Sequence, residues 1–216
     1  MKYKIEDLKK DLYVAVISDV LDIMGYHNQV LESGLLPLRD DTVIAGPAFT
    51  SIGTEVYSMP ENPLVAQCKV VDQLKEGEVY LLVTRGNYTC ALFGELFATN
   101  VNRRGCAGVI LDGDARDIKE LKKMNFPIFF RERNPRTSKG RCEINECQIP
   151  IKMRGVEINP GDFVFADADG VVIIPKAITE KVLDEAYKVV EKENFSRDRL
   201  KNGATMEEIY KNGGAL

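Results

Sequence analysis

The 216-residue sequence contains a single histidine, His27. A zinc site built from two or three histidines therefore cannot form within one chain. A Ser-His-Asp catalytic triad or a Cys-His dyad would have to use His27. That residue follows a predicted helix end at Gly25 and lies in a polar turn, which favours a surface position. A catalytic metal would need mostly oxygen ligands, and such ligands favour Mg²⁺ or Mn²⁺ over zinc.

The cysteines are odd in number and include no Cys-x-x-Cys motif, which fits a reduced, cytoplasmic chain. Cys142 and Cys147 have no second pair and no nearby histidine, so ordinary thiols near a hairpin are favoured over a metal site. The five cysteines are Cys68, Cys90, Cys106, Cys142 and Cys147.

Other absences narrow the class of protein further. No apolar run approaches the roughly 20 residues that span a bilayer, and the apolar stretch near the start is interrupted by Asp19 and Asp22. We therefore expect neither a membrane segment nor a signal peptide. The net charge of -4 argues against nucleic acid as a partner. The glycine-rich loops of common nucleotide-binding folds are also missing.

The centre of the chain alternates buried strands with helices. The runs EVYLLVT (78–84), AGVILDG (107–113) and FPIFFR (126–131) are continuous and apolar, as in strands that are covered on both faces. Helical spacing fills the segments between them, 91–104 and 115–124. This order predicts a parallel βαβαβ core with right-handed crossovers.

The flanking segments complete one mixed α/β domain over residues 1–216. Residues 5–24 predict one helix, 42–58 predict strands, and 64–74 predict a second helix. Turn pairs such as Arg154-Gly155 and Asp169-Gly170 predict antiparallel hairpins within 147–175. A final helix from Ala177 to Asn194 and a polar tail form the C-terminal part, about 177–216.

Ligands of parallel sheets bind beyond the carboxyl ends of the strands. Two such ends, followed by Gly94–Phe97 and Gly113–Asp117, lie side by side in the predicted order. Helix N-termini there would offer unpaired N–H groups to an anionic substrate. Arg116 adds a fork that matches a carboxylate, and Asp117 adds a hard oxygen ligand.

A purely structural interpretation of the same residues is also open. An Arg-Asp pair in a first helical turn is common, because Asp favours the helix dipole. Asp114 is a plausible N-cap, and the acids Asp112, Asp167 and Asp169 are typical of solvated turns. The basic run 131–141 is more typical of a solvated loop than of a phosphate or nucleic-acid patch.

The stretch GELFATNVNRRGCAGVILDGDARDIKELKKMNFPIFFR (94–131) resembles the central block of the RraA-like family. That family includes 4-hydroxy-4-methyl-2-oxoglutarate (HMG) aldolases, which also decarboxylate oxaloacetate. The resemblance continues in SDVLDIMG (18–25), VDQLKEGEVYLLV (71–83) and PGDFVFADADGVVIIP (160–175), and so covers nearly the whole chain.

The family signature is an acidic residue, twenty intervening residues, and Arg-Asp. Glu95 and Arg116-Asp117 match it, with residues 96–115 between them. The family aldolases carry Asp where this chain has Glu95, and the extra methylene changes the reach of the carboxylate.

The resemblance implies a role for each site residue. Asp117 would bind a divalent cation, Mg²⁺ or Mn²⁺, and Arg116 would contact the keto oxygen or carboxylate of a 2-oxo acid substrate. Backbone N–H groups at 94–97 would bind the substrate carboxylate, and Glu95 would hold a water that acts as base. Asn62 would reach in from a neighbouring subunit. The implied site residues are Asn62, Gly94, Glu95, Leu96, Phe97, Arg116 and Asp117.

The resemblance also implies an α/β/β domain of the swivelling type, assembled as a homotrimer or hexamer. The expected activity is that of a carbon–carbon lyase, an HMG-type aldolase or oxaloacetate decarboxylase, which releases a pyruvate enolate. The alternative is a non-catalytic RraA-like regulator that binds a ribonuclease, although those proteins lack the complete acidic–Arg–Asp set. A methyltransferase is disfavoured, because only Gly53 follows the first predicted strand where a glycine-rich loop is needed.

Overall fold

The computed structural model describes residues 2–84, 86 and 89–214. Its helices are α1 (Ile5–Asp11), α2 (Val14–Ile23), α3 (Val65–Val71), α4 (Glu95–Arg103), α5 (Ile118–Lys123), the 3-10 turn η1 (Lys176–Ile178), α6 (Thr179–Lys201) and α7 (Met206–Lys211). Its strands are β1 (Leu36–Pro37), β2 (Ile44–Glu55), β3 (Val79–Val83), β4 (Ala91–Phe93), β5 (Gly108–Asp112), β6 (Asp114–Ala115), β7 (Ile128–Phe130), β8 (Cys142–Cys147), β9 (Ile151–Met153), β10 (Val156–Ile158), β11 (Phe163–Asp167) and β12 (Gly170–Ile174).

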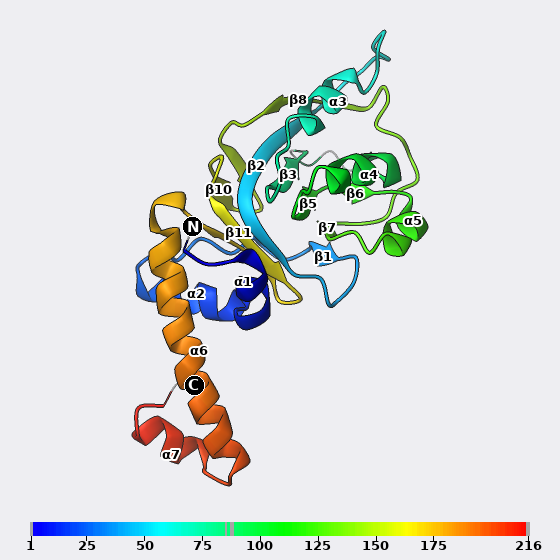
Figure 1. Ribbon diagram of the computed structural model, residues 1–216. Coiled ribbons are helices and arrows are strands. Elements are labelled where there is room, and N and C mark those ends of the chain that lie inside the picture. Colours follow the sequence, from blue (N-terminus) through cyan, green and yellow to red (C-terminus); the bar gives the residue numbers. More distant parts are fainter. Residues whose placement is uncertain (1, 85, 87–88, 215–216) are drawn as a thin grey trace.

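One mixed sheet organises the domain (Figure 1). Its order is β1-β7-β5-β3-β2-β11-β12, with β8 paired to the far end of β2. The pairs β2–β3, β3–β5 and β5–β7 are parallel, while β1, β8, β11 and β12 join antiparallel. The predicted parallel core with an antiparallel section is thereby confirmed.

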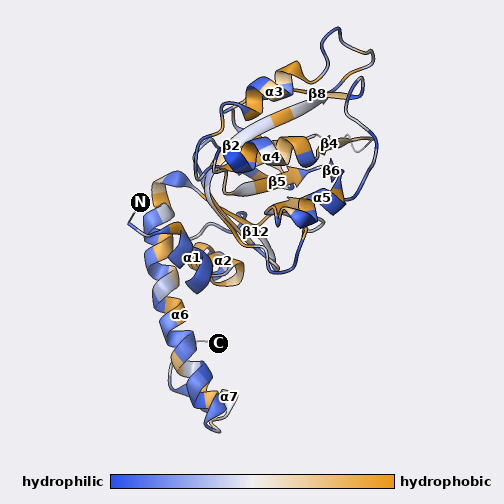
Figure 2. Cartoon of the chain, turned by 45° about the vertical axis from the view of Figure 1, so that its right-hand side comes forward, coloured by the Kyte–Doolittle hydropathy of each residue, from blue (hydrophilic) through white to orange (hydrophobic). Residues whose placement is uncertain are grey.

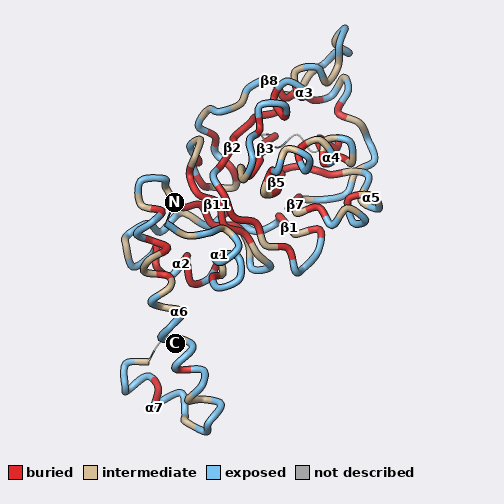
Figure 3. Tube along the Cα trace, in the orientation of Figure 1, coloured by how far each residue is buried: buried red, intermediate tan, exposed pale blue. Residues whose placement is uncertain are grey.

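The central strands are buried along their whole length because both faces of the sheet are covered. Alternate residues such as Tyr80 and Leu82 pack beneath α3, α4 and α5, while Leu81 and Val83 pack towards the hairpin β9–β10. A third apolar cluster lies between α1, α2, α6 and the pair β11–β12. Figure 3 shows this burial concentrated in the strands.

The predicted helix over 5–24 is wrong in one respect, since it is broken at Leu12 and Tyr13. Both residues are extended, with ψ of 164° and 159°. A new helix starts at Val14, whose N–H donates to Oδ2 of Asp167 at 2.8 Å. Asp167 was predicted to lie in a solvated turn; it does accept the N–H of Asp169 in the β11–β12 turn, but its other oxygen caps α2.

Two central helices are shorter than predicted. Residues 91–93 form β4, which pairs in parallel with β6, so the helix predicted over 91–104 begins only at Glu95. The helix predicted over 115–124 begins at Ile118 for the same reason. Asp114 is therefore not the N-cap, and Asp117 occupies that position.

The C-terminal helix is longer than predicted and continues to Lys201. It runs away from the sheet, and the predicted polar tail folds back as α7 (Figure 1). A capping box starts α7, because Thr205 and Glu208 exchange side chain-to-backbone hydrogen bonds. Figure 2 shows the outer part of α6 to be mostly hydrophilic, unlike the sheet.

The histidine, the cysteines and the helices bear on the other expectations. His27 is exposed, with its Nδ1 3.2 Å from Oδ1 of Asp22. All five cysteines are free. Among the described residues, no helix combines the length and apolar character that a bilayer crossing requires.

Candidate functional site

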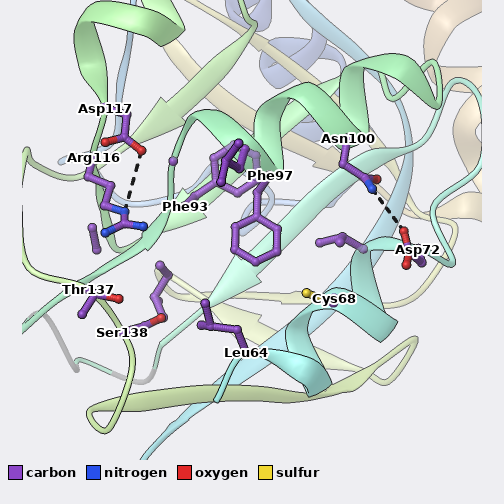
Figure 4. Close-up of a pocket in the computed structure, with 15 residues that line it drawn as sticks. Leu64, Cys68, Asp72, Phe93, Phe97, Asn100, Arg116, Asp117, Thr137 and Ser138 are labelled. Carbon is purple, nitrogen blue, oxygen red and sulfur yellow. Dashed lines mark hydrogen bonds and ion pairs between the residues drawn. The ribbon is translucent and has the colours of Figure 1, made fainter. Parts of the chain in front are cut away.

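A cavity of about 310 Å³ opens between α3 and the segments that follow β3 and β5. Its walls come from α3, β4, the start of α4, the segment before α5, and the loop after β7 (Figure 4). The residues that line it are Leu64, Cys68, Val71, Asp72, Ala91, Leu92, Phe93, Gly94, Leu96, Phe97, Asn100, Arg116, Asp117, Thr137 and Ser138.

Pairing of two short strands places Arg116 and Asp117. Ala91 and Phe93 are in register with Asp114 and Ala115, and the N–H of Arg116 donates to the carbonyl oxygen of Phe93 at 2.9 Å. The chain then turns into α5 through Asp117, whose φ of 58° lies in the left-handed region. A non-glycine residue in this conformation carries strain, which is common at functional sites.

Gly94 permits a close approach between this turn and α4. A Cβ atom at Gly94 would meet Oδ2 of Asp117 at 2.5 Å and Cγ of Arg116 at 3.0 Å. The same Oδ2 accepts the N–H of Glu95 at 3.2 Å and lies 3.8 Å from Nε of Arg116. The Asp117 carboxylate therefore sits at the N-terminus of α4, where the helix dipole favours a negative charge.

An ion pair with a buried carboxylate stabilises the segment that precedes Arg116. Asp114, whose side chain is 3% exposed, accepts hydrogen bonds from Nη2 and Nε of Arg131 at 2.8 and 3.0 Å and from Nδ2 of Asn134 at 3.1 Å. The sequence interpretation missed this pairing, because it treated Asp114 as a local cap and Arg131 as part of a solvated loop.

The loop after β7 was also predicted to be solvated, but part of it forms a wall of the cavity. It runs alongside β6 and β4. The N–H of Ala115 donates to the carbonyl oxygen of Glu132, and the N–H of Ala91 donates to the carbonyl oxygen of Arg136. Thr137 and buried Ser138 consequently line the cavity. The Thr-Ser pair gives no sequence signal of its own, since its role depends on this non-local pairing.

The structure brings five of the seven predicted site residues together. Gly94, Leu96, Phe97, Arg116 and Asp117 all line the cavity. The side chain of Glu95 does not, and its Oε1 instead accepts the hydroxyl of Thr99 at 2.8 Å along α4. Asn62 is exposed on the loop before α3 and does not line the cavity within one chain.

A second, smaller hollow of about 250 Å³ shares Arg116 and Asp117 with the first. Its other walls include Arg133, Asn134 and Pro135 from the loop after β7. The Arg116–Asp117 pair therefore borders two spaces, one on each side of it.

Among the described residues, no group of three or more His, Cys, Asp or Glu side chains could hold a metal, so an ion at this site would need water or substrate oxygens as further ligands. Asp117 is the residue of this site that could bind such a divalent cation. Its side chain is 44% exposed, which leaves room for other ligands. Mg²⁺ commonly binds through one or two carboxylates, with waters and substrate oxygens completing its shell.

Comparisons with known proteins agree with this architecture. Residues 14–173 match the model of the RraA-like family, described as aldolase/RraA. A Halalkalibacterium halodurans protein with the provisional name 4-hydroxy-4-methyl-2-oxoglutarate aldolase is 36% identical over 172 residues, which are 80% of this chain and 77% of that protein.

Two solved structures are similar in fold. An uncharacterized protein from Pseudomonas syringae pv. tomato superposes with a TM-score of 0.84 at 27% identity, covering 95% of this chain and 92% of that one. Streptomyces coelicolor RraAS2, described as an unusual member of the RNase ES inhibitor RraA protein family, gives 0.77 at 25% identity, covering 91% and 98%. The family match, the Halalkalibacterium relative and the two solved structures agree with one another. The chain belongs to the RraA-like family.

Proposed function

We propose that this protein is a divalent-metal-dependent carbon–carbon lyase that cleaves 2-oxo acids to pyruvate, as an HMG-type aldolase, an oxaloacetate decarboxylase, or both. One observation carries the proposal: Arg116 and Asp117 are held together over the N-terminus of α4, at the edge of a cavity large enough for a small acid. The provisional name of the Halalkalibacterium relative supports the lyase class.

The substrate's C1 carboxylate would lie at the start of α4. The N–H groups of Leu96 and Phe97 belong to the first turn, where the helix itself offers them no acceptor, so they can donate to an anion. A Mg²⁺ or Mn²⁺ ion on Asp117 would supply Lewis-acid polarisation of the 2-oxo group.

Arg116 would stabilise the charge that develops during cleavage. As the C3–C4 bond breaks, its electron pair moves towards the C2 oxygen, and the guanidinium can donate to that oxygen. The same enolate forms whether the leaving group is carbon dioxide or a carbonyl compound. One site can therefore support both decarboxylation and aldol cleavage.

Aldol cleavage needs one further step, the removal of the C4 hydroxyl proton. We assign the removal of this proton to the carboxylate of Glu95, which would accept it through an intervening water. Glu95 starts α4 next to Gly94, and its hydrogen bond with Thr99 has to be exchanged for this role.

The direct test is incubation of the pure protein with oxaloacetate, with Mg²⁺, with Mn²⁺ or with EDTA, while pyruvate is followed. We expect pyruvate formation above the rate of the metal ion alone, and loss of that excess in EDTA. Full activity after exhaustive chelation would refute the metal requirement, and no activity with either cation would refute the lyase.

A ribonuclease regulator is the second candidate, because the fold also matches RraAS2. Such a regulator would act by contact and would need no Arg116–Asp117 pair. Binding to a ribonuclease that persists in an Arg116→Ala variant, combined with inactivity on 2-oxo acids, would favour this alternative.

The proposed assembly is a homotrimer or hexamer in the cytoplasm, with a small-molecule substrate and no nucleic acid or membrane partner. The loop that carries Asn62 also exposes Tyr57 and Met59, which are 91% and 63% exposed in the single chain. A neighbouring subunit that covers this loop could receive Asn62 at its cavity. Light scattering that shows a stable, active monomer would refute the assembly.

A further inference from the structure

We infer that the 2-oxo acid this cavity accepts carries an uncharged, apolar group beyond C4, such as an aryl or branched alkyl group. The inference rests on the proposed function and narrows its substrate class. It distinguishes this chain's substrate from HMG, in which a second carboxylate occupies that position.

The cavity has polar groups at both ends and an apolar body between them (Figure 4). Arg116 and Asp117 form one polar end, with Thr137 and Ser138 beside them, and Asp72 and Asn100 form the other. The body is walled by two aromatic rings, Phe93 and Phe97, which stack at a centroid distance of 6.3 Å. Leu64, Val71 and Leu92 add further apolar surface.

The charges of the lining disfavour a second carboxylate. Among the described residues that line this cavity, Arg116 is the only Lys or Arg, and the other charged groups are Asp72 and Asp117. Asp72 lies at the opposite end from Arg116, where its Oδ1 accepts Nδ2 of Asn100 at 3.2 Å and Nη2 of Arg104 at 3.1 Å. A distal carboxylate would therefore lose water against apolar walls, and the described lining offers it no cation besides Arg116.

The smaller hollow is more open to water. Arg133 and Pro135, which line it, are exposed, so water reaches a group placed there. The larger cavity instead has buried walls, including Val71, Leu92 and Phe93. An apolar group gains by leaving water, and the larger cavity offers it more buried apolar wall.

The reaction is balanced for this substrate class. The C3–C4 bond of a 4-hydroxy-2-oxo acid breaks, and its electron pair forms the pyruvate enolate. The C4 hydroxyl loses its proton and becomes the carbonyl of an apolar aldehyde or ketone. Protonation of the enolate at C3 gives pyruvate, so no oxidant or reductant is needed.

Two non-cleavable probes test the cavity separately from catalysis. 2-Oxo-4-phenylbutanoate and 2-oxoglutarate share the 2-oxo acid head and differ in the distal group. We expect calorimetry in Mg²⁺ to show the phenyl compound binding at least about tenfold tighter, since one methylene in an apolar pocket is already worth about tenfold or more. Equal or tighter binding of 2-oxoglutarate would overturn the inference.

Two variants test whether the preference for the phenyl compound arises in the larger cavity. Phe97→Ala should reduce the preference for the phenyl compound, whereas Phe195→Ala, which truncates an exposed ring on α6, should not. Cys68→Arg places a cation in the cavity wall and should shift the preference towards 2-oxoglutarate. Gln73→Arg adds the same charge at an exposed position outside the lining and serves as its control.

The outcomes separate this inference from the proposed function. Tight binding of the phenyl probe without cleavage of 4-hydroxy-2-oxo-4-phenylbutanoate or oxaloacetate would refute the lyase and keep the cavity's preference. Faster cleavage of HMG than of the phenyl substrate would keep the lyase and overturn the preference. If Arg133→Ala then abolished HMG cleavage, the distal group would lie in the smaller hollow.

Discussion

Asp117 passes so close to Gly94 that a Cβ atom on Gly94 would lie 2.5 Å from Oδ2 of Asp117. Gly94→Ala should therefore push the Asp117 carboxylate off the start of α4. We expect kcat/KM for oxaloacetate to fall about 10²-fold, the scale of loss for a displacement of about 1 Å at a reacting group.

Gly25→Ala is the matched control for Gly94→Ala. Gly25 has a φ of +87° with no neighbour near the added Cβ, so alanine there costs about 1–2 kcal/mol of backbone strain. It should lower the melting temperature and leave kcat/KM unchanged. Equal activity losses in both variants would show that stability, rather than the position of Asp117, explains the effect.

Arg116→Lys tests the guanidinium. Lysine keeps the charge but not the planar fork, so turnover should fall about 10²–10³-fold, the usual loss for one oxyanion donor. The melting temperature should change little, because Arg116 is partly exposed. Arg136→Lys, at an exposed position of the nearby loop, is the control. Normal turnover in Arg116→Lys would place the oxyanion donor elsewhere.

Glu95→Gln separates the two reactions. Oxaloacetate has no C4 hydroxyl proton to remove, so decarboxylation should be little affected while aldol cleavage is strongly impaired. If Glu95 only complements the helix N-terminus, the change would cost about 0.3–1 kcal/mol of stability and leave both rates alone. Glu95→Asp should retain aldol cleavage. Rates for both substrates and a melting curve distinguish the cases.

Asp114→Ala should destabilise the fold by about 3 kcal/mol, near the lower end of the range for breaking a buried pair, because Arg131 is 25% exposed. The urea midpoint should fall accordingly. Asp41→Ala removes an exposed partner of Arg39 and should leave the midpoint nearly unchanged. A urea midpoint in Asp114→Ala that is as high as in Asp41→Ala would show that the buried pair does not stabilise the fold.

Thiol labelling tests the burial of the cysteines. Burial raises the pKa of Cys142 to about 12 and also raises the pKa of Cys90 and Cys106. Because the thiolate is the reactive form, a raised pKa lowers the reactivity of these side chains. Exposed Cys68 should react first with iodoacetamide, and a bound 2-oxo acid should protect it. Rapid labelling of Cys142, seen by peptide mass spectrometry, would contradict this burial.

The sequence predicted the centre of the fold because its signals there are local. The apolar runs around Tyr80 and Ile110 indicated strands covered on both faces, and parallel order then placed Gly94 near Arg116. The glycine and the Arg-Asp pair could thus be assigned to one site before their distances were known.

Features that depend on distant partners could not be predicted in this way. The break at Tyr13 depends on Asp167, which is more than 150 positions away. The Asp114–Arg131 pair and the contribution of Ser138 depend on how the loop after β7 lies against β6. The Glu95 side chain is a local exception, since it is held by Thr99 one turn along its own helix.

Two separate parts of the chain form the two ends of the cavity. Arg116 and Asp117 are fixed by β4, β6 and the start of α5, whereas Leu64, Cys68 and Val71 belong to α3 and its start. Substitutions in α3 can therefore reshape the space offered to a substrate while the reacting end keeps its geometry. Such a division makes the scaffold adaptable: a few changes in one helix can alter what the cavity accepts, while the Arg116–Asp117 end stays in place.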